Sequence, residues 1–194
     1  MTTPKKTKRF SAVIPADKKG DDQPSGNYSG GIHNTEIAVR LANIVANFVH
    51  LEERMSFVLA ILLGASHEEP AKYVLRSIKS PKARIDVMKA LLTEAPSNVQ
   101  RDSSYDEIID EFADINNLRN GFVHGIWWTH ESGRVFLSRF LDDFQGMVAR
   151  EVKPHEMDQL LARMHALTQK ILRHPFRELV DKQNVGASIK YNFP

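Results

Sequence analysis

The feature that most constrains the fold of this chain is a long amphipathic run that begins near residue 35. Its apolar residues alternate spacings of three and four: Ile37, Leu41, Ile44, Phe48, Leu51, Met55, Val58 and Leu62. A second apolar row lies beside the first: Val45, Val49, Leu59 and Leu63. The pattern predicts one long helix, capped by Asn34 or Thr35, ended by Gly64 and buried along a broad face. Such a helix is typical of the central element of a helical bundle.

Start and stop signals predict four more helices. Proline is favoured in the first turn of a helix and disfavours helical structure at the residue before it. Pro70, Pro81 and Pro154 mark three of the starts, and acidic residues that suit a helix N-terminus follow Tyr105. The predicted ranges are 70–78, 81–95, 105–123 and 154–174.

A β-hairpin is predicted between the last two helices. Aromatic and β-branched residues at 126–130 and 134–140 flank a glycine-containing turn. The expected fold is therefore all-α, a helical bundle with a long first helix and one hairpin, at about 126–140, inserted before the last helix.

Charge and composition divide the chain into three parts. Residues 1–33 contain six Lys and Arg and three Asp, which gives a net charge of +3. Because the whole chain has a net charge of +2, the remaining residues carry −1. Their polar, Gly- and Pro-containing composition predicts a disordered basic leader, more commonly a solvated tail than a contact for RNA or a membrane surface. The folded domain is expected at 34–180 and a loose tail at 181–194. The domain is close to neutral, so no broad basic surface is expected.

Several classes of site are excluded by what the chain lacks. It contains no Cys, which excludes disulfides, thiolate zinc sites, iron–sulfur clusters and cysteine nucleophiles. Its apolar runs are shorter than the about 20 residues that cross a bilayer, and it has no secretory signal, so we expect a cytoplasmic protein without membrane contact. It has no phosphate-binding glycine motif, nucleophile elbow, helix-turn-helix or metal-ligand spacing. We therefore expect neither a metal nor a cofactor.

A cation interrupts the apolar face of the predicted helix 105–123. Arg119 lies in line with the apolar stripe Ile108, Phe112, Ile115 and Phe122. Burying a guanidinium is costly unless it is paired or faces a polar cleft. Asn120 and His124 are four residues apart and share a face about 100° further around the helix, within reach of a long arginine side chain.

An arginine, an amide and a histidine at one helix end suit phosphodiester chemistry. Arginine can neutralise a phosphorane-like transition state through two parallel hydrogen bonds, and histidine exchanges protons near neutral pH. Spacing alone does not identify such a site, because Arg150 and His155 repeat it in a predicted polar loop. The Arg119–His124 match differs from the second one because Arg119 lies on a predicted buried stripe and is followed by Asn120.

The segment Leu-Arg-Asn-Gly-Phe-Val-His-Gly at residues 118–125 resembles the R-(four to six)-H motif of the HEPN superfamily of α-helical domains. The long first helix is similar to the opening helix of that family. The resemblance implies a metal-independent endoribonuclease that works as a homodimer, with the motif helices of two subunits facing each other across a composite cleft. It implies that Arg119 binds the scissile phosphate, that His124 transfers a proton or positions the 2′-hydroxyl, and that Asn120 orients His124 or a phosphate oxygen. The RNA's own 2′-hydroxyl would attack, leaving a 2′,3′-cyclic phosphate.

Three further residues are candidates for a supporting role. Glu52, on the first helix, either counters the charge of Arg119, as acidic residues do in parts of the family, or is simply solvated. Trp127 and Trp128 point to opposite faces of their strand, so only one packs easily into the bundle. The other either stacks on unpaired RNA bases or makes a dimer or rim contact.

Two functions remain open at this point. The first is a dimeric ribonuclease of the HEPN type, acting as a toxin or a defence effector and held in check by a neutralising protein. The second is a non-catalytic HEPN-like module for dimerisation or for binding RNA or a partner, in which Arg119 and His124 form a structural polar network.

Overall fold

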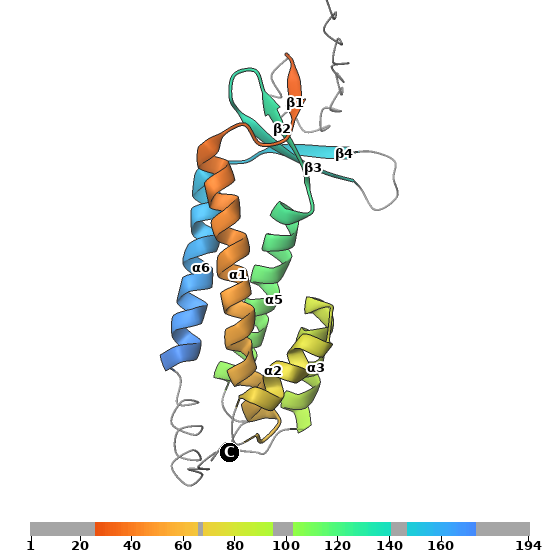
Figure 1. Ribbon diagram of the computed structural model, residues 1–194, viewed down its shortest axis with the longest axis vertical. Coiled ribbons are helices and arrows are strands. Elements are labelled where there is room, and N and C mark those ends of the chain that lie inside the picture. The colour runs from red at the N-terminus through yellow and green to blue at the C-terminus, as the bar shows by residue number, and fades with distance from the viewer. Residues whose placement is uncertain (1–25, 66–67, 95–102, 141–146, 174–194) are drawn as a thin grey trace, which may run out of the picture. The chain divides into compact units, whose positions relative to one another are not determined.

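The computed structural model describes residues 26–65, 68–94, 103–140 and 147–173 of the chain. Five helices and four strands lie in these ranges (Figure 1). In chain order they are β1 (Tyr28–Gly30), α1 (Thr35–Leu62), α2 (Glu69–Ser77), α3 (Pro81–Glu94), α5 (Ser104–Val123), β2 (Ile126–His130), β3 (Val135–Phe140), β4 (Met147–Glu151) and α6 (Pro154–Arg173). The described residues form two compact units, one of residues 26–42 with 120–140 and 147–158, the other of residues 43–65, 68–94 and 103–119 with 159–173.

The helices confirm the predictions made from apolar spacing and from proline positions. The predicted long helix is α1, and the other four predicted ranges differ from α2, α3, α5 and α6 by one residue at most at each end. Asn34 accepts a hydrogen bond from the first turn of α1, as a capping residue does. At the other end Gly64 has φ 64°, and the amides of Gly64 and Ala65 donate to Ile61 and Ala60 at 2.9 and 2.8 Å. This glycine-dependent ending satisfies two of the last carbonyls of α1.

In the second unit, α1, α5 and α6 are joined by an aromatic stack and by ion pairs. Phe48 of α1 stacks on Phe112 of α5, with 5.6 Å between the ring centroids and 10° between the planes. Arg163 of α6 bonds both carboxylate oxygens of Glu111 on α5, at 2.7 and 2.8 Å, and this guanidinium lowers the pKa of Glu111. The apolar stripe predicted on α5 is buried at Ile108, Phe112 and Ile115.

The second apolar row of α1 is less buried than expected. Val45, Val49 and Leu63 are 38, 48 and 42% exposed, whereas Leu59 is fully buried. The prediction of a broad buried face is therefore wrong for most of this row, because the contacts of the unit bury the first row and leave much of the second facing outward.

The first unit contains a four-stranded antiparallel sheet in the order β1-β2-β3-β4 (Figure 1). Strands β2 and β3 are the predicted hairpin, with Trp128 opposite Phe136. The expectation of an all-α fold with a single hairpin is corrected, because β1 and β4 extend that hairpin on both sides. The described part of the chain is mostly helical with a small sheet.

The strand β1 also corrects the extent of the leader. Residues 28–30 pair with β2, so the predicted disordered leader at 1–33 does not reach this far. Residues 1–25 and the predicted tail at 181–194 lie outside the described residues. Arg150, predicted in a polar loop, lies in β4 opposite Leu137.

The sheet carries a different set of side chains on each face. Trp127 and Leu137 are cross-strand neighbours on one face. On the other face the ring of Tyr28 lies 4.9 Å from that of His130 and 5.5 Å from that of Phe136. Desolvation by these neighbours raises the pKa of Tyr28. Both faces of the hairpin are therefore packed, as the alternation of strand side chains allows.

Candidate functional site

The predicted motif lies at the C-terminal end of α5. The helix ends at Val123, but the amide of His124 still donates to the carbonyl of Asn120 at 3.0 Å, so His124 continues the helical path. Gly125 then leads into β2. A Cβ placed on Gly125 would lie 2.3 Å from Cδ1 of Leu137, so β3 approaches the backbone here as closely as a glycine permits.

Arg119 is the last residue of this stretch of the second unit and is half-buried there. Its Cζ lies 4.5 Å from the ring centroid of Phe48, which is itself stacked on Phe112. A guanidinium over an aromatic ring is attracted by the negative face of that ring, which offsets part of the cost of removing the charge from water. The predicted position of Arg119 against apolar side chains is confirmed.

Asn120 and His124 belong to the first unit and differ in exposure. Asn120 is half-buried, whereas His124 is exposed. The imidazole is therefore open to solvent at a helix end. An exposed imidazole in this place can exchange a proton with a molecule that binds there.

The two tryptophans take opposite faces of β2, as predicted. The indole Nε1 of Trp127 donates to the carbonyl of Phe122 at 3.0 Å, and the two rings stack with 6.4 Å between centroids. Trp127 therefore caps a carbonyl in the last turn of α5. Trp128 lies on the other face with Phe136, and its buried Nε1 has no hydrogen-bond partner in the part of the chain that the structure describes.

Glu52 is paired, and its partner is a residue that the sequence analysis did not single out. A carboxylate oxygen of Glu52 accepts a hydrogen bond from Arg84 of α3 at 2.8 Å, and both side chains are about four-fifths buried. The Glu52 charge is thus countered by Arg84. No local signal links two residues 32 positions apart, so the pair could not be read from spacing.

Arg150, which the sequence analysis placed in a polar loop, lies beside the last turn of α5. The guanidinium of Arg150 lies 5.6 Å over the ring of Phe122 and forms an ion pair with Glu156 of α6. Because β4 was not predicted, nothing in the sequence placed Arg150 next to Phe122. The structure therefore adds a positive charge to the end of α5 in the first unit.

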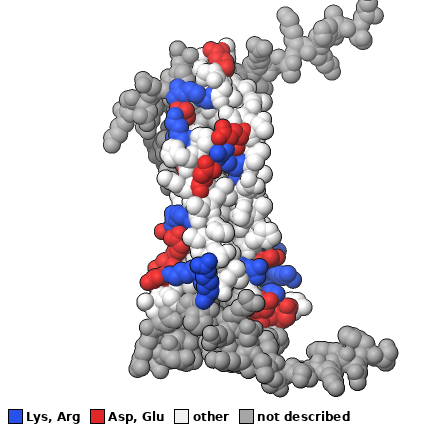
Figure 2. All heavy atoms as spheres, turned by 90° about the vertical axis from the view of Figure 1, so that its left-hand side faces the viewer, with Lys and Arg blue, Asp and Glu red and all other residues white. Residues whose placement is uncertain are grey.

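Charges of both signs alternate on the described surface. Figure 2 shows Lys and Arg beside Asp and Glu on one face of the molecule. The ion pair of Arg40 with Asp158, at 2.8 Å, is one example. The face shown carries no broad basic surface, as the near-neutral charge of the domain predicts.

Among the described residues, no group of three or more His, Asp or Glu side chains is placed to hold a metal ion. None of the described helices combines the length and the apolar character needed to cross a bilayer. Comparisons with protein-family models, with curated proteins and with solved structures gave no match to this chain. The interpretation of the site therefore depends on its own residues.

Proposed function

We propose that this protein is a metal-independent endoribonuclease of the HEPN type that acts as a homodimer on RNA. The observation that carries the proposal is the end of α5, where an exposed His124 lies one helical turn after Asn120. Arg119, directly before Asn120, supplies the cation. The mostly helical fold is compatible with such a domain.

The proposed reaction uses only the RNA and these side chains. A base, His124 of one copy, removes the proton of the 2′-hydroxyl, whose oxygen forms a new bond to phosphorus. The bond from phosphorus to the 5′-oxygen breaks, and that oxygen takes up the proton that His124 removed and leaves as a 5′-hydroxyl, so the other product ends in a 2′,3′-cyclic phosphate. Arg119 stabilises the charge that develops on the phosphate oxygens. Asn120 orients the imidazole or a phosphate oxygen.

Cleavage of a fluorescent single-stranded RNA in the presence of EDTA tests the proposal. We expect cleavage by the wild type, and a loss of about 10²-fold or more in rate for Arg119→Ala and for His124→Ala. Arg173→Ala and His165→Ala, which change exposed side chains of α6, serve as matched controls and should cleave normally. The proposal fails if the wild type leaves the RNA intact or if both motif variants cleave at the wild-type rate.

One observation favours a second function, a non-catalytic HEPN-like module for dimerisation or for binding RNA or a partner protein. The contact of Arg119 with the buried ring of Phe48 is what a structural cation would make. Thermal unfolding separates the two functions. If Arg119 is structural, Arg119→Ala should lower the free energy of unfolding by about 3–5 kcal/mol, the loss found when a buried charge pair is broken. A catalytic Arg119 would leave the melting temperature nearly unchanged while cleavage is lost.

A further inference from the structure

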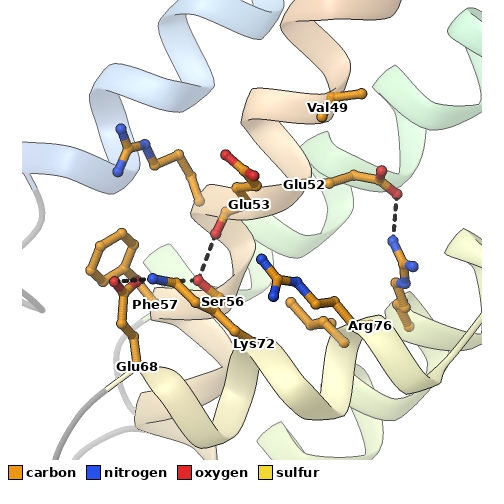
Figure 3. Close-up of a pocket in the computed structure, with 11 residues that line it drawn as sticks. Val49, Glu52, Glu53, Ser56, Phe57, Glu68, Lys72 and Arg76 are labelled. Atoms are coloured by element: carbon orange, nitrogen blue, oxygen red, sulfur yellow. Dashed lines mark hydrogen bonds and ion pairs between the residues drawn. The ribbon is translucent and has the colours of Figure 1, made fainter.

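A cavity of about 330 Å³ opens in the second unit between α1 and α2, with Arg84 of α3 at one end (Figure 3). We call it the α1–α2 pocket. Its apolar lining comes from Val49, Phe57 and Leu75, and its polar lining from Ser56 and seven charged side chains. None of the residues of the predicted nuclease motif lines it.

The walls of the α1–α2 pocket are held by hydrogen bonds and ion pairs. At one end Glu68 pairs with Lys72, and the buried Ser56 hydroxyl, which donates to the carbonyl of Glu53 at 2.6 Å, lies 3.4 Å from the Glu68 carboxylate. At the other end Arg84 bonds Glu52 at 2.8 Å and the carbonyl of Ile78 at 2.7 Å. These contacts hold Glu52, Glu68 and Arg84 in place before any ligand enters.

The guanidinium of Arg76 gives the α1–α2 pocket a local contact for an anion. The lining holds four cations and three carboxylates, and two of each are paired as described. Arg54, Arg76 and Glu53 remain in the lining, and Lys72 also pairs with Glu69 at 3.2 Å, so the charges around the pocket balance. Arg76 has no ion-pair partner within the described ranges, and Figure 3 shows its side chain extending from α2 into the space between Ser56 and Glu52.

The size and the apolar lining restrict the ligand further. The volume lies at the lower end of the range of about 300–1,000 Å³ for small-molecule sites, which corresponds to a single ring with one head group. Val49 is 48% exposed in the lining, and Arg54 lies 5.9 Å over the ring of Phe57. Arg54 already covers the ring of Phe57, so an apolar body is expected beside Val49, where it would cover part of the exposed side chain.

We propose that the α1–α2 pocket binds a small organic anion, with a phosphate or carboxylate group on Arg76 and a ring-sized apolar body against Val49. A guanidinium binds either head group through two parallel hydrogen bonds. The pocket uses residues that the proposed nuclease does not, so either proposal can fail without the other.

Isothermal titration calorimetry on the full chain tests this site with four probes: phenyl phosphate, benzoate, inorganic phosphate and benzyl alcohol. We expect phenyl phosphate or benzoate to bind one per chain, and the tighter of the two identifies the head group. Inorganic phosphate lacks the ring and benzyl alcohol lacks the charge, so each should bind at least about tenfold more weakly. Failure of both ring-bearing anions to bind, or equal binding of benzyl alcohol, would overturn the proposal.

Variants locate the binding. Arg76→Gln should weaken the binding of the tighter anion by about tenfold or more, because it removes the charged side chain that contacts the head group. Val49→Glu, at a half-exposed position that tolerates a polar side chain, should do the same by placing a negative charge in the cavity. Arg173→Gln, an exposed arginine of α6, should bind as the wild type does. Unchanged affinity in Arg76→Gln and Val49→Glu would show that the anion binds elsewhere.

Discussion

The negative charge of Glu151 is strongly stabilised by two neighbouring cations. It lies at the end of β4, where it accepts a hydrogen bond from Arg134, the residue before β3, and Lys153 approaches it to 2.8 Å. These two cations, Arg134 first, lower the pKa of Glu151 from 4.5 to about 2. Because the folded state binds the proton more weakly than the unfolded chain does, the pair stabilises the fold fully above pH 4.5. That contribution is lost as the pH falls from about 4.5 through about 2.

Replacing the Glu151 carboxylate should change how the free energy of unfolding depends on pH. Glu151→Gln should lower the free energy of unfolding at pH 7 by about 1.5–3 kcal/mol, the usual contribution of a hydrogen bond to a charged group. The same variant should lose less stability than the wild type between pH 5 and pH 2, since it has no proton to take up there. Urea unfolding at several pH values measures both effects. Glu94→Gln, at the exposed end of α3, is the control, and a similar pH dependence in both variants would contradict the assignment.

Some residue positions could be predicted from the sequence, whereas the ion-pair partners of charged residues could not. The position of Arg119 follows from helical periodicity, because residues 3 and 4 apart share a face within one element. The partners of Glu52 and Arg134 depend on contacts between elements, and no spacing within an element encodes them. The same holds for the α1–α2 pocket, whose lining comes from three helices and from Glu68, the residue before α2. The spacing of residues within one helix therefore predicts where Arg119 lies, but it does not predict the ion pairs between different elements.

At the scale of elements, helices were predicted better than strands. Each helix carries several turns of apolar spacing and a proline, glycine or polar signal at its ends. The strand β1 has only three residues, two of them Ser and Gly, and β4 is the segment Met-Val-Ala-Arg-Glu with little alternation. Both strands form because the hairpin offers them unpaired backbone groups on either side. Their formation depends on pairing across the sheet and not on a local pattern.

The junction of α5 and β2 offers a test at this scale, because two glycines near it are in opposite environments. A Cβ on Gly125 would meet Cδ1 and Cγ of the buried Leu137 at 2.3 and 2.9 Å, whereas a Cβ on Gly121 would meet nothing within 4 Å. We expect Gly125→Ala to lower the free energy of unfolding by about 1–3 kcal/mol, as overpacking does. Gly121→Ala should raise it by about 0.5–1 kcal/mol, because alanine is the better helix former.

Denaturant unfolding of both variants measures these changes, and each serves as the control of the other. If Gly125→Ala is as stable as Gly121→Ala, β3 does not press on the end of α5 as closely as the structure indicates.

At the scale of the whole molecule, charge limits how RNA can be bound. Beyond residue 33 the chain is close to neutral, and the described surface mixes both signs. Non-specific attraction to phosphates is therefore weak outside the leader. A nuclease of this kind has to rely on a few local cations, and two-fold assembly doubles their number at a composite cleft.

Mixing inactive subunits tests the composite cleft directly. If each site takes Arg119 from one copy and His124 from the other, an equimolar mixture of Arg119→Ala and His124→Ala chains contains heterodimers with one intact site. We expect the mixture, after subunit exchange, to recover about a quarter of the wild-type cleavage rate, as random pairing dictates for a two-fold dimer.

Light scattering in the same samples should give a mass of twice the 22.0 kDa of the single chain. No recovery in a mixture whose subunits have exchanged would mean that each copy carries a whole site. A monomeric mass would remove the dimer from the proposal.

The short connection between α5 and β2 has a consequence for how related chains can differ in length. Only His124 and Gly125 separate the helix from the strand. One residue inserted there would turn Trp127 and Trp128 to the wrong faces of the sheet or move His124 off the helix end. Insertions and deletions among descendants of this sequence should therefore fall elsewhere, for example in the exposed turn at residues 131–133, while this two-residue connection keeps its length.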